Sequence, residues 1–155
     1  MKDQMLEIKT SIQVLCTPEE VFEAIADPEK ITGYFLSRSS GRLEPGRTVN
    51  WKFPEFDIVF PVRVKKVEKD SYLSFFWDSE DGSETLVEIT LAPAGDRATK
   101  VSVEEKGMPD NEAGIRWLKG NTEGWANFLA CLKAYLEYGI NLRKGAFDYL
   151  KPATE

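Results

Sequence analysis

The fold is decided by the stretch GWANFLACLKAYLEYG, residues 124–139, which lies near the end of the 155-residue chain. Its large apolar residues recur at intervals of three and four, so at about 100° per residue they share one face of a helix. These residues are Trp125, Phe128, Leu129, Leu132, Tyr135 and Leu136. The pattern predicts an amphipathic helix that ends at Gly139 as its C-cap and buries one aromatic side. Such a stripe is more often core than ligand site, so the rest of the chain must show what it packs against.

A long region of alternating apolar and polar residues precedes this helix and is typical of antiparallel strands. Turn-forming sequences interrupt the alternation at EPGR, PEFD, EKDS, SEDGS and APAGDR. We expect a meander of six strands, at residues 38–43, 48–53, 56–67, 72–78, 84–92 and 98–105. In the longest of them one face carries Phe56, Ile58, Phe60, Val62 and Val64. Pro61 indicates an edge or bulged position in that strand.

The N-terminal region predicts a strand followed by two short helices. LEIKTSIQV, residues 6–14, alternates as a half-buried strand does. Thr17 and Glu20 have the spacing of a capping box, which places the start of the first helix at Thr17. The dipeptide Asp27-Pro28 ends that helix and can cap a second.

Composition removes several classes of function. The net charge of −6 repels phosphate, so we expect no nucleic acid partner, and no run approaches the roughly 18 apolar residues that a membrane span needs. Histidine is absent, which removes the commonest general base and the usual zinc ligand. Cys16 and Cys131 are expected to be buried free thiols in a cytoplasmic protein. We assign no catalytic residue, no metal site and no cofactor.

The order of these elements predicts an α+β architecture in one domain, residues 1–155. A twisted antiparallel sheet with one long helix to cover it curls around that helix. Asp110, Asn111 and Asn121 can each cap the start of the helix, so the sequence does not decide at which residue the helix begins. A curved sheet and a straight helix diverge along their length, so we expect a wedge-shaped space between them.

The same residues carry a resemblance to a known family. The segment TPEEVFEAIADPEKITGYF, the strand YLSFFWDS and the terminal GWANFLACLKAYLEYG resemble the family named after the activator of the 90-kDa heat-shock protein ATPase. That family belongs to the START-related, Bet v-like superfamily, also called SRPBCC, so the resemblance implies a helix-grip fold. The superfamily includes lipid carriers, hormone receptors and polyketide cyclases, and fold alone does not choose among them.

The pocket that we expect between sheet and helix has aromatic and aliphatic walls. Its candidate residues are Trp51, Phe53, Phe60, Phe75, Trp77, Trp125, Leu129, Leu132 and Leu136. Polar candidates at its mouth are Tyr34, Arg63, Glu105, Arg116 and Asn121. Glu105 ends a strand whose alternate residues are apolar, so inside the protein it could serve as an acid or a hydrogen-bond anchor. For each residue taken alone, ordinary core or surface packing is the commoner role.

Three functions compete on this pattern. The leading hypothesis is a binding module for a small hydrophobic, lipid-like molecule. The second is a protein-interaction domain with a chaperone or another protein as partner, in a chaperone-related or stress-response role. The third is a cyclase- or hydrolase-like enzyme that uses a cavity carboxylate such as Glu105.

Overall fold

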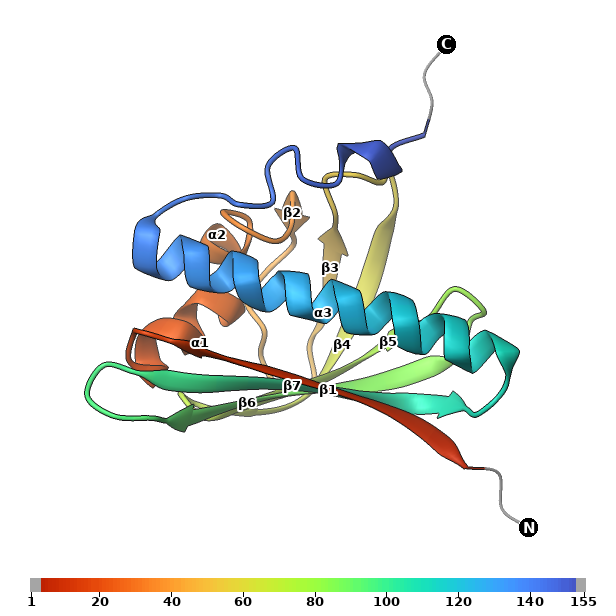
Figure 1. Cartoon of the computed structure of the whole chain (residues 1–155), viewed down its shortest axis with the longest axis horizontal. Coiled ribbons are helices and arrows are strands. Elements are labelled where there is room, and N and C mark those ends of the chain that lie inside the picture. The colour runs from red at the N-terminus through yellow and green to blue at the C-terminus, as the bar shows by residue number, and fades with distance from the viewer. Residues whose placement is uncertain (1–3, 153–155) are drawn as a thin grey trace.

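A computed structural model, which describes residues 4–152, contains a seven-stranded antiparallel sheet curled beneath one long helix (Figure 1). The order of strands in the sheet is β1-β7-β6-β5-β4-β3-β2, so β2 to β7 form a meander and β1 joins it beside β7. The elements are β1 (Met5–Val14), α1 (Pro18–Ala26), α2 (Pro28–Ile31), β2 (Arg38–Ser39), β3 (Thr48–Lys52), β4 (Val59–Glu68), β5 (Tyr72–Asp78), β6 (Glu84–Pro93), β7 (Thr99–Pro109), α3 (Glu112–Tyr138) and the 3-10 helix η1 (Asp148–Leu150). The predicted α+β helix-grip architecture is confirmed.

The helix boundaries follow the local chemistry of the sequence. The Thr17 hydroxyl accepts a hydrogen bond from the Glu20 amide at 3.2 Å, and the Glu20 carboxylate accepts one from the Thr17 amide, which completes the predicted capping box. The Asp27 carboxylate accepts from the Glu29 amide at 2.9 Å and caps α2. Gly139 ends α3 with φ of 68°, in the left-handed region that favours glycine, so this predicted C-cap is confirmed.

The start of α3 is resolved in favour of Asn111. Its side-chain oxygen accepts a hydrogen bond from the Gly114 amide at 2.8 Å. The helix therefore runs through Gly120 and Gly124 without interruption. Trp117 and Trp125, both buried, supply the tertiary packing that outweighs the poor helix propensity of these glycines.

Two of the predicted strands lose residues to loops in the structure, and a third, β7, is longer than predicted. The expected strand at residues 56–67 begins only at Val59, and Phe56 and Ile58 stand exposed in a loop, at 39% and 66% of their surface. Alternation predicts faces only for residues that have a neighbouring strand, and β3 ends at Lys52, opposite Val59. Similarly, the expected strand at residues 38–43 is reduced to the two residues of β2.

Pro61 and Gly107 mark irregular points of the sheet. Pro61 is opposite Asn50 of β3, whereas β4 pairs with β5 only from Arg63 onward, so Pro61 stands at a local edge as predicted. Gly107, with φ of 128°, is the extra residue where the register of β1 and β7 shifts. This bulge lets β7 continue to Pro109, beyond the predicted end at residue 105.

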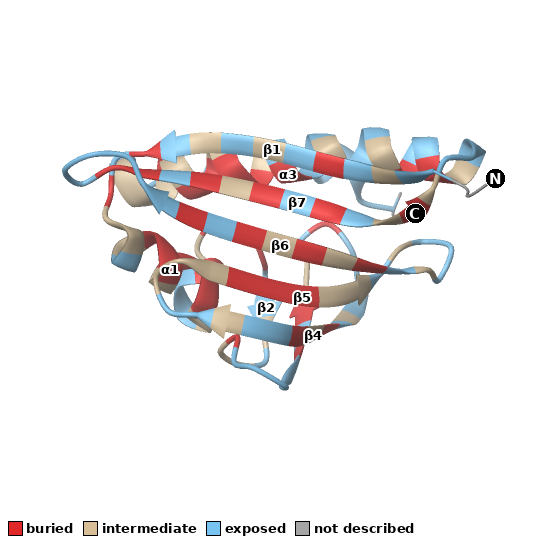
Figure 2. Cartoon of the chain, turned by 90° about the horizontal axis from the view of Figure 1, so that it is seen from below, coloured by how far each residue is buried: buried red, intermediate tan, exposed pale blue. Residues whose placement is uncertain are grey.

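The core lies between the inner face of the sheet and the C-terminal half of α3. Residues along β1, β7 and β6 alternate between more buried and more exposed (Figure 2). Phe128, Leu129 and Leu132 are at most 1% exposed in the facing helix. Cys16 and Cys131 are buried free thiols, as predicted. Within residues 4–152, no helix has the length and apolar composition that crossing a bilayer requires.

We expect Gly114→Ala to lower the free energy of unfolding by at least about 2 kcal/mol, because its Cβ would overlap the Pro109 carbonyl oxygen and crowd Leu6. Gly120→Ala is the matched control on the same helix, since no atom lies within 4 Å of its added Cβ. That variant should gain about 0.5–1 kcal/mol from helix propensity. Urea unfolding followed by circular dichroism measures both values, and equal stability of the two variants would contradict the close approach of α3 to β7.

Candidate functional site

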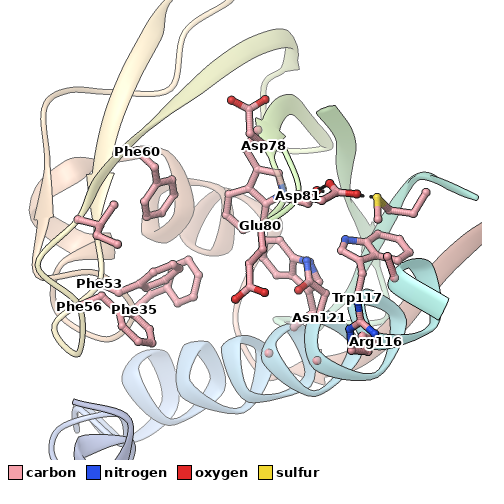
Figure 3. Close-up of a pocket in the computed structure, with 18 of the residues that line it drawn as sticks. Phe35, Phe53, Phe56, Phe60, Asp78, Glu80, Asp81, Arg116, Trp117 and Asn121 are labelled. Carbon is pink, nitrogen blue, oxygen red and sulfur yellow. Dashed lines mark hydrogen bonds between the residues drawn. The ribbon is translucent and has the colours of Figure 1, made fainter. Parts of the chain in front are cut away.

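A cavity of about 720 Å³ lies between the N-terminal half of α3 and the part of the sheet formed by β4, β5 and the loop before β4. Its size falls within the range of small-molecule sites, roughly 300–1,000 Å³. The wall is mainly apolar, and the side chains that project toward the space come from the loops, the sheet and the helix (Figure 3). The aromatic lining residues are Phe35, Phe53, Phe56, Phe60, Trp77, Trp117 and Trp125.

Small residues on α3 leave room for this cavity. Ala113, Gly120 and Gly124 all line it, and their spacing of seven and four residues places them on one face of the helix. No atom lies within 4 Å of a Cβ built on Gly120 or Gly124. The C-terminal half of the same helix carries Phe128 and Leu132 instead and is closely packed. The wedge expected from a curved sheet and a straight helix therefore opens toward the N-terminal end of α3.

The back of the wall is organised by Glu105, which is 1% exposed. Its Oε1 accepts hydrogen bonds from Trp125 Nε1 at 2.8 Å and from Asn121 Nδ2 at 3.0 Å. Its Oε2 accepts from Trp77 Nε1 at 2.9 Å and from the Thr85 hydroxyl at 2.6 Å. Four donors thus occupy the four favourable positions around one carboxylate, which is the pattern that an ionised group requires.

This network fixes two tryptophans as a stacked pair. The Trp77 ring, on β5, and the Trp125 ring, on α3, lie with centroids 5.4 Å apart and planes at 29°. Each indole uses its one N–H on Glu105, so neither ring can turn without losing a charge-assisted hydrogen bond. The two rings therefore present a preformed apolar surface to the cavity. Glu105 does not line the cavity and acts on it through these rings.

The rim of the cavity carries three acidic side chains, and two of them, Glu80 and Asp81, form no ion pair within residues 4–152. Asp78, Glu80 and Asp81 lie on the β5–β6 hairpin, and Figure 3 shows Glu80 extending across the opening toward α3. The Ser79 hydroxyl and the Ser83 amide hold the pKa of Asp81 below its usual range, so this carboxylate is ionised at neutral pH. In the part of the chain that the structure describes, no three Cys, Asp or Glu side chains gather as metal ligands.

A buried ion pair closes the other end of the cavity. Arg143, in the segment after α3, donates to Glu55 at 2.5 Å, and the two side chains are 11% and 2% exposed. The guanidinium also lies 5.1 Å from the ring centroid of Phe53 and 4.8 Å from that of Phe147. These contacts hold the C-terminal segment against the loop after β3, which carries the exposed Phe56.

The structure brings four of the ten predicted pocket residues to the cavity. These four are Phe53, Phe60, Trp77 and Trp125. Trp51 and Phe75 are at most 2% exposed and pack behind Trp77, with centroid distances of 6.3 and 5.5 Å. Glu105 lies behind the same ring as its hydrogen-bond acceptor. The remaining three do not line the cavity, since they belong to the closely packed half of α3: Leu129, Leu132 and Leu136.

The polar residues expected at the mouth divide in the same way. Arg116 and Asn121 line the cavity. Tyr34 is fully buried, and its hydroxyl donates to the Ala24 carbonyl at 2.9 Å; burial raises its pKa well above the usual value. Arg63 lies outside, where it bridges Asp78 and Glu84 at 3.0 and 2.8 Å.

Sequence reasoning missed three kinds of lining residue. Phe35 follows a short helix and Arg143 follows the long one, and neither belongs to a periodic pattern. Trp117 lies about two turns before the stripe that begins at Trp125 and was not assigned to it. The spacing of Ala113, Gly120 and Gly124 was the available signal, because small residues on an otherwise bulky face indicate a gap.

We expect Glu105→Gln to lower the free energy of unfolding by about 2–4 kcal/mol, because the amide offers one acceptor oxygen in place of two and turns a donor toward other donors. Glu104→Gln is the matched control. Glu104 precedes Glu105, is exposed and pairs with Lys9. Removing its charge should change the free energy of unfolding by less than about 0.5 kcal/mol. Chemical unfolding measures the stability of both variants, and tryptophan fluorescence reports the surroundings of Trp77 and Trp125. A Glu105→Gln variant with the stability and the fluorescence spectrum of the parent would show that Glu105 does not anchor these rings.

A family model described as activator of Hsp90 ATPase homolog 1-like protein matches residues 15–137. No curated protein matches the chain.

Solved structures of similar fold cover most of the chain. The protein SSP2350 from Staphylococcus saprophyticus is 34% identical, with a TM-score of 0.78 over 89% of this chain and 96% of that one. DynU16, a putative protein in the dynemicin biosynthetic locus, is 26% identical, with a TM-score of 0.75 over 86% of this chain and 48% of that one. The Aha1 dimer from Colwellia psychrerythraea shares the fold at 19% identity, with a TM-score of 0.69 over 87% of this chain and 98% of that one.

The family match spans most of the chain, and the SSP2350 structure supports it at an identity well above the level at which fold alone is shared. The chain belongs to the activator of Hsp90 ATPase homolog 1-like family of the SRPBCC superfamily.

Proposed function

We propose that this domain binds a small hydrophobic molecule in the cavity between α3 and the sheet. The observation that carries the proposal is the preformed aromatic wall, in which Trp77 and Trp125 are fixed by one buried carboxylate. A wall held rigid before binding loses little conformational entropy when a ligand arrives, which favours affinity. A fold that needed only a closely packed core would gain more by filling this space.

The lining supports ring-bearing ligands in particular. Phe53 and Phe60 stack at 5.2 Å on one side of the cavity, and Trp77 packs edge to face on Phe60 at 5.8 Å. Burying apolar area contributes about 25 cal/mol per Å² and aromatic pairs add about 0.5–1.5 kcal/mol, so compounds with rings gain the most from this lining. A flexible acyl chain would pay more conformational entropy for the same area.

Glu105 supports binding better than catalysis. A general acid or base must reach a proton on the substrate, and both oxygens of this carboxylate are already occupied by donors behind the wall.

The two free, buried thiols agree with the cytoplasm as the expected compartment.

A protein-interaction role is the second candidate, and exposed apolar side chains near the C-terminus favour it. They are Tyr138, Ile140, Leu142, Tyr149 and Leu150, each at least 46% exposed. The name of the family adds a chaperone as an expected partner, and a neighbour in fold is described as a dimer. Sedimentation velocity of the parent chain and of Tyr138→Lys tests this role. If the parent chain is a monomer at every concentration, the protein-interaction role does not include self-association.

The binding proposal predicts saturable uptake of an uncharged aromatic probe such as N-phenyl-1-naphthylamine, with one site per chain. Gly124→Leu should weaken probe binding at least about tenfold, because it fills part of the cavity, whereas helix propensity should keep the variant at least as stable as the parent. Probe fluorescence and thermal unfolding on the same samples give both quantities.

Ala126→Leu is the matched control, because Ala126 is exposed on α3 and does not line the cavity. It adds the same side chain to the same helix and should leave probe binding unchanged. A parent chain that takes up no probe would refute the binding proposal, and so would equal binding by Gly124→Leu and the parent.

A further inference from the structure

Trp117 carries a buried hydrogen-bond donor that nothing in the described chain accepts. The residue is 8% exposed and lines the cavity, and its Nε1 has neither a partner nor contact with solvent. The other two tryptophans of the wall, Trp77 and Trp125, donate their N–H groups to Glu105. Buried polar groups are nearly always paired in native proteins, so this donor requires an explanation, as does Arg143 Nε, which lines the same cavity and is also without a partner in the described chain.

The position of this donor relates it to the cavity. Figure 3 shows the nitrogen of Trp117 on the side of its ring that faces the interior, between the hairpin that carries Asp81 and the helix that carries Asn121. Met108 lines the same cavity and is 2% exposed. Because the nitrogen has no contact with solvent in this structure, an acceptor reaches it only when a side chain of this wall moves, and a methionine side chain adapts its shape at small cost.

The charges around the cavity select among the groups that could accept from this donor. Glu80 and Asp81 have no basic partner among residues 4–152, and Asp78 shares Arg63 with Glu84. The acidic side of the rim therefore disfavours a carboxylate or phosphate on the ligand.

The basic lining residues do not reverse this preference. Arg143 is neutralised by Glu55 in a buried ion pair. Arg116 is 69% exposed and lies 3.4 Å from Glu112, so solvent and an adjacent acid weaken its field inside the cavity. An uncharged acceptor oxygen meets Trp117 without entering a repulsive field.

We propose that Trp117 determines specificity, and that the cavity takes an uncharged ring compound whose carbonyl oxygen accepts a hydrogen bond from Trp117 Nε1. This inference rests on the proposed binding function and names the class of ligand for the same cavity. The acidic rim rejects the carboxylate analogue of such a compound, and the orphan donor discriminates against an analogue in which carbon replaces the oxygen.

Three naphthalenes of nearly equal shape separate these effects. 2-Acetylnaphthalene carries the carbonyl, 2-isopropenylnaphthalene replaces its oxygen with a methylene group, and 2-naphthoate carries a charge. Competition with N-phenyl-1-naphthylamine should rank the ketone about tenfold above the alkene, since the hydrogen bond is made in a site with little water, and should rank the naphthoate last.

Trp117→Phe removes the donor and keeps an aromatic ring. The ketone should lose about tenfold in affinity for this variant while the alkene keeps its parent value, which a merely structural role of Trp117 would not produce. Arg116→Gln should leave the ranking of all three compounds unchanged. If the naphthoate binds best and loses affinity in Arg116→Gln, the cavity is an anion site and the inference is wrong.

The indole N–H resonances of the parent give a readout that does not depend on a variant's affinity. The resonance absent from Trp117→Phe identifies Trp117, and it should shift downfield on addition of the ketone but not of the alkene. If the probe binds and ketone and alkene bind equally, the inference is overturned while the binding function stands. If no probe binds, the binding function itself fails.

Discussion

The carboxylate of Glu105 is the interaction on which the relation between sheet and helix depends. It gathers donors from three elements besides its own strand: Trp77 from β5, Thr85 from β6, and Asn121 and Trp125 from α3. Hydrophobic packing alone resists separation of α3 from the sheet but allows sliding and rotation, because it has no direction. Four directed hydrogen bonds to one buried anion fix both the distance and the rotation of α3. The cost of burying this charge is offset only when all four are made.

The same constraint explains how an apolar cavity persists next to a closely packed core. Without it, the rings of Trp77 and Trp125 would be free to rotate into the space that Gly120 and Gly124 leave beside them. Since each indole N–H is directed backward to Glu105, the ring faces stay forward. The polar network thus lies behind the apolar surface and shapes it without contributing a group to it. Stability and the shape of the site therefore share one residue, which places Glu105 among buried polar groups that specify a unique arrangement.

The sequence predicted those features that local chemistry determines. The capping box at Thr17 and the left-handed cap at Gly139 depend on a few adjacent residues, so their positions were correct. Strand parity predicted that Glu105 points inward. It did not predict which groups donate hydrogen bonds to Glu105, because those groups are set by the register of β5 and β6 and by the rotation of α3. Phe56 and Ile58 alternate like strand residues but lie in a loop. Periodicity could not predict this, because it does not show whether a partner strand is present. Periodicity also treated Leu129 and Trp125 as equivalent, whereas the divergence of helix and sheet puts only Trp125 at the cavity.

Among the tryptophans of the cavity, the contrast between satisfied and unsatisfied donors separates the requirements of the fold from those of a ligand. Trp77 and Trp125 donate within the protein, so their hydrogen bonds are complete before any ligand arrives. Trp117 has the same chemical group, buried from water, with no acceptor in the described chain. Phenylalanine in its place would fill similar space without an unpaired donor, so packing alone gives no reason for an indole there. Local rules of polar satisfaction are broken most often at functional sites, where a ligand completes them. By that reasoning the unpaired nitrogen at the cavity, rather than its aromatic wall, carries the information about what the cavity recognises.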